Sequence, residues 1–336
     1  MKVAILGVSS SYRSFSGSSL VDNLYNSINA DVIILSDEKV FSKYHVPYRK
    51  FSDVNPKDYD VVFIPSCVLT KDEERKIGKF NTNTMITLVS SLDNRTAVNE
   101  SIVDNYIFKD SIMLFPTKKM QDIYKRSVKK SFVVTFPYAS EYKIGRKNNR
   151  CFITSGLISE INNFDILTTV LEQVNCRFEM IFGLGSAKGL DKSTELFGKI
   201  VSNGNVLMSY CKYGYNKTFL ISETTKSAAY VNLYDNTSFY GVRYSELEAI
   251  DLGCIPISLE DSKEAYEKLG LKGLFYSDAE SLMDAMKKIM NNNVDSKIID
   301  ENRLALREIN GKFSADMEKI FKECCDFSFT SIRKSN

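Results

Sequence analysis

One stretch does most to decide the fold of this chain, namely Gly241-Val242-Arg243-Tyr244-Ser245-Glu246-Leu247-Glu248-Ala249-Ile250-Asp251-Leu252-Gly253-Cys254-Ile255-Pro256-Ile257. Its apolar spacing predicts a short amphipathic helix, Gly253 predicts a tight turn, and the apolar run that follows predicts a buried strand. An acidic residue, Glu248, stands at the start of the small-residue run that leads into Gly253. The stretch therefore predicts a helix, a turn and a strand, with a carboxylate beside the turn.

The same alternation of strands and helices extends over the rest of the chain. Apolar, β-branched runs predict strands at Lys2–Leu6, Asp31–Leu35, Asp60–Ile64, Met85–Val89, Ile112–Phe115, Phe132–Phe136, Cys151–Thr154, Phe178–Phe182, Asn205–Met208, Ala228–Leu233, Cys254–Leu259 and Leu274–Tyr276. Helical patterns separate them, as at Ser18–Ile28, Lys118–Lys129, Asn163–Gln173, Tyr244–Ile250, Ser262–Leu269 and Ala279–Met290. Continuous apolar runs suit strands that are buried on both faces of a parallel sheet. We therefore predict an α/β protein with doubly wound sheets.

A change in composition divides this pattern into two halves. Near Tyr142–Asn149, Lys, Arg, Asn and Gly replace the apolar periodicity, and a length of 336 residues suits two domains. We expect a first domain over residues 1–145 and a second over residues 146–312. The end of the chain, Glu301–Phe327, has a helical pattern.

The overall composition is that of a soluble globular protein, with 43% hydrophobic and 26% charged residues. No apolar run approaches the roughly 20 residues that span a bilayer, and Val3–Val8 is too short for a signal peptide. The seven cysteines include no Cys-x-x-Cys pair, which favours a reducing compartment and argues against structural zinc.

The titratable residues exclude some classes of enzyme. The single histidine, His45, lies in a loop-like segment without a Gly-x-Ser-x-Gly elbow, so a Ser-His-Asp hydrolase is not indicated and a general base is expected to be a carboxylate. The one Asp-x-Asp, Asp58-Tyr59-Asp60, precedes a strand, whereas a metal–diphosphate site would follow one. We predict no metal ligands, and the sequence leaves help from Mg²⁺ or Mn²⁺ open.

Charge is distributed unevenly along a chain of net charge +2. Residues 117–150 contain ten basic and two acidic side chains, so this segment carries +8 and the rest of the chain −6. Such an asymmetry fits contact with a polyanion. A solvated helix face joined to a basic linker explains it equally well.

Loops that follow predicted strands are where chemistry is expected in such sheets. The first, Gly7–Ser19, offers backbone amides and hydroxyls to a phosphate or sugar, with Gly17 and Ser18 where the next helix begins. It matches neither Gly-x-Gly-x-x-Gly nor a P-loop, and a flexible turn with Ser18 or Ser19 as N-cap is the alternative.

The loop after the fourth predicted strand contains Asp93 and Arg95. Asp93 is suited to take a proton from an acceptor hydroxyl, and Arg95 to hold an acceptor phosphate. The alternative is that Asp93 caps the next helix and that Arg95 is solvated.

Three further places are suited to a diphosphate or a base. Gly183–Gly189 presents amides and Lys188, although a plain strand-to-helix connection fits nearly as well. Arg243, with Tyr244 beside it, is suited to neutralise a pyrophosphate, the alternative being an exposed arginine paired with a glutamate of its own helix. Met208, at the end of a predicted strand, is placed to touch the base through its backbone.

The opening stretch resembles the nucleotide-sugar signature of GT-B glycosyltransferases, which is roughly Leu-Glu-Ala-x-x-x-Gly-x-Pro. The resemblance implies that Glu248 accepts hydrogen bonds from the ribose hydroxyls of the donor nucleotide. It also implies the GT-B fold, in which two Rossmann-like, doubly wound domains face each other across a deep cleft.

Most of the chain resembles, in order, the DNA β-glucosyltransferases of T-even-type phages. The segments that carry the resemblance are Met1–Ile5, Phe51–Asp60, Leu92–Arg95, Phe136–Ile144 and Arg243–Ile257. Such enzymes are cytoplasmic in the infected cell and transfer a sugar from a UDP-sugar to 5-hydroxymethylcytosine that is flipped out of duplex DNA.

This resemblance implies a role for each candidate residue. Asp93 is the general base of an inverting reaction, while Glu248, Arg243, Tyr244, Gly183, Gly17, Ser18, Met208 and Lys188 surround the UDP-sugar. The first domain binds DNA through Arg95, Lys118, Lys119, Lys125 and Arg126. The helix over residues 313–336 packs back on that domain, and the enzyme is expected to act as a monomer without a membrane.

The sequence also departs from this family. The loop Thr154–Glu160 contains no cation where the family has paired arginines, which leaves the donor open between UDP-glucose and another UDP-sugar such as UDP-arabinose. Tyr240 stands where retaining enzymes often have a glutamate, which favours inversion. Two alternatives remain, a bacterial glycosyltransferase of surface glycan or lipopolysaccharide and a nucleotide-binding module without catalysis.

Overall fold

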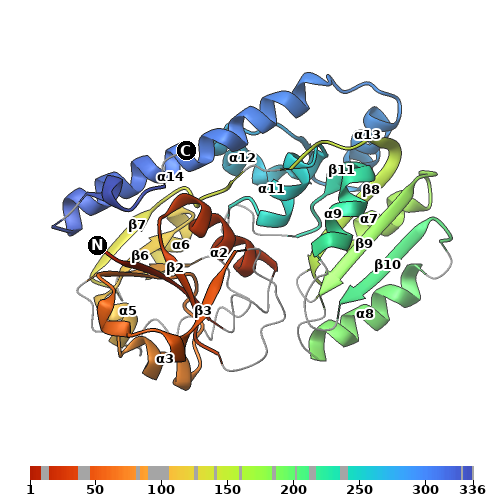
Figure 1. Cartoon of the computed structure of the whole chain (residues 1–336). Helices are drawn as coiled ribbons and strands as arrows, with labels where there is room; N and C mark the ends of the chain where they lie inside the picture. The colour runs from red at the N-terminus through yellow and green to blue at the C-terminus, as the bar shows by residue number, and fades with distance from the viewer. Residues whose placement is uncertain are drawn as a thin grey trace. The chain divides into compact units, whose positions relative to one another are not determined.

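The structure, a computed structural model, describes residues 1–8, 15–36, 46–80, 84–89, 106–124, 128–139, 142–158, 161–183, 187–200, 203–211, 217–234, 241–326 and 328–334. The chain forms two compact units. Unit 1 consists of Met1–Ala139 with Glu308–Asn336, and unit 2 of Ser140–Arg307. Each unit is built around its own parallel sheet (Figure 1).

The sheet of unit 1 has the strand order β3-β2-β1-β4-β5-β6-β7, and every neighbouring pair is parallel. The order reverses its direction between β1 and β4, as in a doubly wound sheet. The strands are β1 (Val3–Gly7), β2 (Asp31–Ile34), β3 (Tyr48–Lys50), β4 (Val61–Ile64), β5 (Thr84–Leu88), β6 (Ile112–Phe115) and β7 (Lys130–Val133). Strands β1, β4 and β6 are buried along their whole length, which explains their continuous apolar runs.

Helices α2 (Phe15–Ser27), α3 (Lys71–Ile77), α5 (Tyr106–Asp110) and α6 (Lys118–Tyr124) belong to unit 1. The long helix α14 (Lys297–Cys324) belongs to unit 2 up to Arg307 and to unit 1 from Glu308 onward. Its second part is an integral piece of unit 1, because Phe313 and Phe321 are fully buried and Asp316 accepts the amide of Thr135 at 2.9 Å.

The sheet of unit 2 has the order β10-β9-β8-β11-β12-β13, again with parallel neighbours throughout. Its direction reverses between β8 and β11. The strands are β8 (Asn148–Leu157), β9 (Arg177–Gly183), β10 (Val206–Cys211), β11 (Ser227–Val231), β12 (Ile255–Leu259) and β13 (Leu274–Tyr276).

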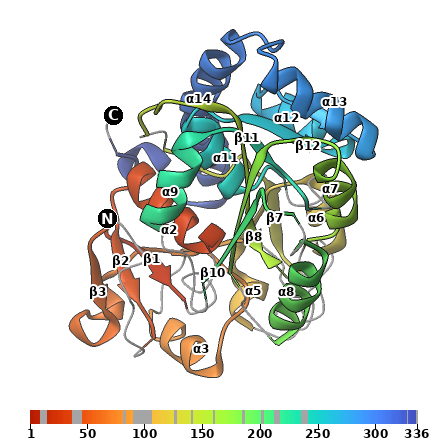
Figure 2. The same ribbon diagram turned by 90° about the vertical axis from the view of Figure 1, so that its right-hand side faces the viewer.

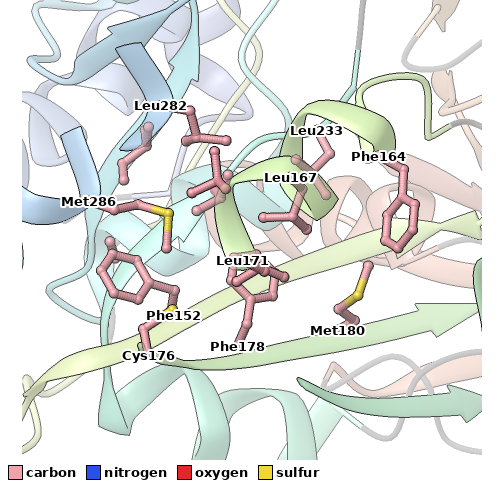
Figure 3. Packing of buried hydrophobic residues seen from close by; sticks show 14 of the residues in the cluster. Phe152, Phe164, Leu167, Leu171, Cys176, Phe178, Met180, Leu233, Leu282 and Met286 are labelled. Atoms are coloured by element: carbon pink, nitrogen blue, oxygen red, sulfur yellow. The ribbon is translucent and has the colours of Figure 1, made fainter. Parts of the chain in front are cut away.

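Helices α7 (Phe164–Leu171), α8 (Ala187–Ile200), α9 (Lys217–Lys226), α11 (Tyr244–Asp251), α12 (Lys263–Leu269) and α13 (Ala279–Met290) accompany this sheet. Helix α13 packs against α7 (Figure 2). Figure 3 shows the core between these helices and the sheet, where Phe152 and Phe178 of the strands meet Leu167 of α7 and Met286 of α13. These four side chains are fully buried. The core holds the inner strands in place, so the ends of those strands form a fixed platform.

The predicted α/β class with two doubly wound parallel sheets is confirmed, and each predicted strand is present within a few residues. One strand and two boundaries differ from the prediction. Strand β3 was not predicted, because its three residues are exposed and two of them are charged. Strand β10 continues to Cys211 rather than ending at Met208, and helix α8 begins at Ala187, inside the segment interpreted as a loop.

Candidate functional site

Polar side chains gather where the strand order of the second sheet reverses. Ser155 lies near the end of β8, Asn232 and Tyr234 follow β11, and α11 begins shortly afterwards. In open parallel sheets, ligands bind at the carboxyl ends of the strands beside such a reversal. This place in the fold is therefore the candidate site of unit 2.

Helix α11 is an internal helix, since all eight of its residues are buried. Gly241, with a φ of 77°, turns the chain toward it, and Arg243 occupies the N-cap position with extended backbone. The helix ends in a second left-handed glycine, Gly253 (φ 85°), and β12 follows. Its three acidic residues, Glu246, Glu248 and Asp251, are each at most 5% exposed, so each needs compensating contacts.

Glu246 is the centre of a buried hydrogen-bond network. Its Oε1 accepts the hydroxyls of Ser258 and Tyr266, and the amide Nδ2 of Asn232 lies 3.4 Å from its Oε2. Burial raises the pKa of Glu246, while the two hydroxyls and the charge of Arg243 oppose that rise. The network joins α11 to the ends of β11 and β12, which indicates that Glu246 holds the site together.

A second set of hydroxyls ties α11 to β8. The Tyr230 hydroxyl, on β11, donates to the backbone oxygen of Ser155 at 2.8 Å and lies 3.1 Å from the Ser245 hydroxyl. Burial raises the pKa of Tyr230, so this phenol stays protonated and keeps its hydrogen bonds at neutral pH. Strands β8 and β11 are thus joined to the first turn of α11.

Arg243 lies over an aromatic ring beside the reversal point. Its guanidinium carbon is 4.2 Å from the ring centroid of Tyr234, a cation–π distance. The Tyr234 hydroxyl in turn lies against Gly156, at the end of β8. A Cβ on Gly156 would come within 1.9 Å of that hydroxyl, and the φ of +155° at this residue also favours glycine. Arg243, Tyr234 and Gly156 therefore form one continuous set of contacts from α11 to β8.

This arrangement bears on the loop after β8, whose sequence contains no cation. Tyr234 follows β11 and contacts both Arg243 and the end of β8. The guanidinium of Arg243 therefore reaches the reversal point from the side of β11. A planar guanidinium on a fixed platform is suited to bidentate contact with a phosphate.

Glu248 lies one turn of α11 after Tyr244 and is 5% exposed. Burial and the negative charge of Glu248 hold the pKa of Tyr244 well above its usual range. Tyr244 is thus a neutral phenol beside a carboxylate, an arrangement that can present both a donor and an acceptor.

Asp251, the last residue of α11, is fully buried and has a different set of partners. Its Oδ1 lies 3.6 Å from Nε of Arg303, and its Oδ2 accepts the amide of Tyr142 at 3.4 Å. Arg303 also donates to the backbone oxygen of Tyr142 at 2.7 Å. Asp251 therefore anchors α11 to the two segments of unit 2 that lead to unit 1, which is a structural role.

Several predicted donor residues lie in regular structure rather than in loops. Helix α2 begins at Phe15, so Gly17 and Ser18 are in its first turn and neither Ser18 nor Ser19 is its N-cap. Lys188 is in the first turn of α8, and Gly183 ends β9 as expected. Met208 was expected at the end of a strand. It lies in the middle of β10, where it pairs with Met180, because β10 continues to Cys211. Their roles toward a donor stay predictions.

The predicted acceptor residues are described only in part. Asp93, Arg95, Lys125 and Arg126 lie outside the described residues, as does His45. Lys118 and Lys119 form the exposed first turn of α6, and Lys118 pairs with Asp122 at 3.3 Å.

The described ranges contain no cluster of three or more His, Cys, Asp or Glu side chains that could hold a metal ion. Within the same ranges, no helix is long and apolar enough to cross a membrane. The described cysteines, among them Cys67, Cys151, Cys176 and Cys254, are free thiols.

Sequence reasoning missed two residues of this site. Glu246 was considered only as a partner for Arg243, and Tyr234 was not considered at all. Nothing in the local pattern marks Tyr234, and the partners of the two residues, Tyr266 for Glu246 and Gly156 for Tyr234, are distant in sequence. A polar residue on the buried face of α11 was the one available signal for Glu246.

No model of a known protein family matches the sequence, and no curated protein is similar to it in sequence. Similar solved structures are found. Sucrose-phosphate synthase from Thermosynechococcus elongatus is 11% identical, with a TM-score of 0.60, over 96% of this chain and 98% of that one.

Two further structures cover nearly the whole chain. HepE of Anabaena, solved in complex with UDP, is 11% identical with a TM-score of 0.63 over 96% of this chain and 99% of its own. The trehalose-6-phosphate synthase OtsA is 8% identical with a TM-score of 0.63 over 97% and 99%. At such identities the similarity concerns the fold, and the chain has the GT-B fold of these glycosyltransferases.

Proposed function

We propose that this protein is a glycosyltransferase that takes its sugar from a UDP-sugar. The observation that carries the proposal is the position of Arg243, at the N-cap, and of Glu248, inside one buried helix at the reversal point of the second sheet. Arg243 is suited to the diphosphate and Glu248 to the ribose hydroxyls. HepE, which has the same fold, was solved with UDP and with UDP-glucose, and this supports a UDP-linked donor.

For the acceptor, we propose 5-hydroxymethylcytosine in duplex DNA. The support is the resemblance to phage DNA β-glucosyltransferases and the basic segment 117–150. The exposed first turn of α6, with Lys118 and Lys119, belongs to that segment and is suited to DNA phosphates, together with Lys125, Arg126 and Arg95. The hydroxymethyl group is reached after the base leaves the stack.

In the proposed reaction, Asp93 takes the proton of the hydroxymethyl group. The alkoxide oxygen attacks the anomeric carbon of the sugar, and the bond to the UDP oxygen breaks with inversion. Arg243 neutralises the charge that develops on the leaving diphosphate. The donor is UDP-glucose or another UDP-sugar such as UDP-arabinose. We place the enzyme in the host cytoplasm. Unit 1 is assigned to binding of the acceptor, and unit 2 to binding of the nucleotide.

The test is transfer of label from radiolabelled UDP-glucose to a hydroxymethylcytosine duplex, beside an identical duplex with plain cytosine. Label in the modified duplex alone is expected. An Asp93→Asn variant should lose turnover while still binding UDP, and an Asp110→Asn variant, which changes an exposed carboxylate of α5, should keep both. Full turnover by Asp93→Asn would refute the assignment of the base.

A small or glycan acceptor is the second candidate, because sucrose-phosphate synthase and trehalose-6-phosphate synthase share this fold. Duplex DNA would then take no label. Hydrolysis of a UDP-sugar without acceptor would still separate an enzyme from a non-catalytic nucleotide-binding module.

A further inference from the structure

The open edges of the two sheets are not alike. Strand β3 has three residues, two of them cationic, β7 has four and begins with a lysine, and β13 has three. Strand β10 has six residues, Val-Leu-Met-Ser-Tyr-Cys, without a charge or a proline. Natural sheets protect their open edges with short strands, charges or prolines. Strand β10 has none of these devices, which indicates that its edge is covered by another strand.

The backbone of β10 has groups available for such pairing. The backbone oxygen of Asn205 accepts the amide of Phe178, so Asn205 directs its backbone groups toward β9. Successive residues of a strand direct these groups to opposite sides, and Met208 and Tyr210 therefore direct theirs to the outer edge. The amide of Val206, at the start of the strand, donates to the backbone oxygen of Asn203 instead. Among the described residues, β9 is the one strand that pairs with β10.

Exposed apolar side chains accompany this edge. On α8, Leu190 is 56% and Phe197 is 54% exposed, and on β10, Tyr210 is 38% exposed. The hydroxyl of Tyr210 lies 3.5 Å from the backbone oxygen of Ser193, which places the strand directly against the helix. Figure 1 shows β10 as the last strand of its sheet, with α8 near it. One apolar surface thus extends from the helix to the strand edge.

The spacing on α8 suggests what covers this surface. Leu190 and Phe197 are seven residues apart, or about two turns, so they lie on one face of the helix. When two copies of α8 run antiparallel about a two-fold axis, Leu190 of each copy meets Phe197 of the other. The stripe that Leu190 and Phe197 form on α8 is therefore complementary to itself, as an isologous interface requires.

We propose that the protein forms a two-fold dimer through the edge of β10. The two β10 strands pair antiparallel, so that the two second sheets become one continuous sheet, and the two α8 helices pack together on one face of it. The uncharged edge and the self-complementary stripe favour a second copy of this chain over a different protein. The proposal replaces the expectation of a monomer, and it does not depend on the proposed activity.

The first experiment is sedimentation equilibrium of the full chain, which should give twice the chain mass of 38.2 kDa. The double variant Leu190→Glu/Phe197→Glu places four carboxylates in the dimer interface and should weaken association by more than about a hundredfold. The matched control is Leu304→Glu, since Leu304 on α14 is 58% exposed and lies outside this surface. A monomeric wild-type protein, or equal weakening by the control, would overturn the proposal.

A second experiment tests the symmetry. Thr194 is exposed and lies midway between Leu190 and Phe197, so in the proposed dimer it faces its own copy. Mild oxidation of Thr194→Cys should give a cross-linked dimer on a non-reducing gel, and the wild-type protein, treated alike, should give none. A Leu304→Cys variant that cross-links as readily as Thr194→Cys would contradict the two-fold arrangement.

Discussion

The two ends of the second sheet bury carboxylates in different ways. At the carboxyl end, the hydroxyls of Ser258 and Tyr266 surround Glu246. At the amino end, Arg177 contacts Glu179 at 2.7 Å, and Lys226 contacts Glu223 at 2.6 Å. Neutral donors hold a carboxylate by geometry, whereas cations hold it by charge. The stability of the amino end should therefore respond to pH, and that of the carboxyl end should respond to the loss of a single acceptor atom.

The largest effect is expected where the geometry is removed. Glu246→Ala leaves two buried hydroxyls without their acceptor and opens a cavity, so it should lower the free energy of unfolding by about 3 kcal/mol. Urea unfolding followed by circular dichroism measures the loss. Glu246→Gln keeps the size and one acceptor oxygen and should cost less than half as much. An alanine variant as stable as the wild type would show that the network does not support the site.

The next effect concerns binding at the same end. Arg243→Ala should weaken UDP affinity by about 2 kcal/mol, because a charge-assisted contact to the diphosphate is lost, while stability changes little. Titration calorimetry with UDP measures the change. Arg150→Ala, which alters an exposed arginine at the other end of β8, is the control and should bind UDP like the wild type. Equal UDP affinity in the Arg243 variant would remove this residue from the site.

A smaller effect is expected for Glu248→Gln, about 1 kcal/mol in UDP affinity, because an amide replaces a charged acceptor of the ribose hydroxyls. The sharper measurement compares UDP with its 2′-deoxy analogue. The wild type should prefer UDP, and the variant should lose most of that preference. A preference that survives the substitution would place the ribose elsewhere.

The smallest effect tests the amino end. Burial and the neighbouring Glu223 raise the pKa of Glu179, so the folded state favours its protonated form more than the unfolded chain does. Its contribution to stability is present below the pKa of an unfolded glutamate and is lost as pH rises through the raised value. Relative to the wild type, Glu179→Gln should therefore gain up to about 1 kcal/mol between pH 4 and pH 7. Urea unfolding at both pH values measures this, and Glu195→Gln, an exposed control on α8, should show no such gain.

The sequence predicted the strands well because several of them, such as β1, β4 and β6, are apolar and buried along their whole length. It failed at β3, where Tyr48, Arg49 and Lys50 pair at an edge without burying an apolar face. It also failed at the start of α8, where Gly189 suggested a loop although the helix continues through it. In both places tertiary contacts outweigh local preference.

For the site, the sequence pointed to α11 because its pattern is local, and Arg243 and Glu248 do lie on that helix or at its N-cap. It could not find Tyr234 as the support of Arg243, because the contact with Gly156 joins residues from different strands. The loop with Asp93 is outside the described residues, and its role stays a proposal.

The division of α14 between the two units has a consequence for biosynthesis. Unit 2 is continuous in sequence, so all of it is synthesised before the second half of α14. Unit 1 begins first but is finished last, since Phe313, Phe321 and Phe329 fill its interior from the far end of the chain. We expect unit 2 to fold while the core of unit 1 is still open. A chaperone can bind residues 1–139 during this time.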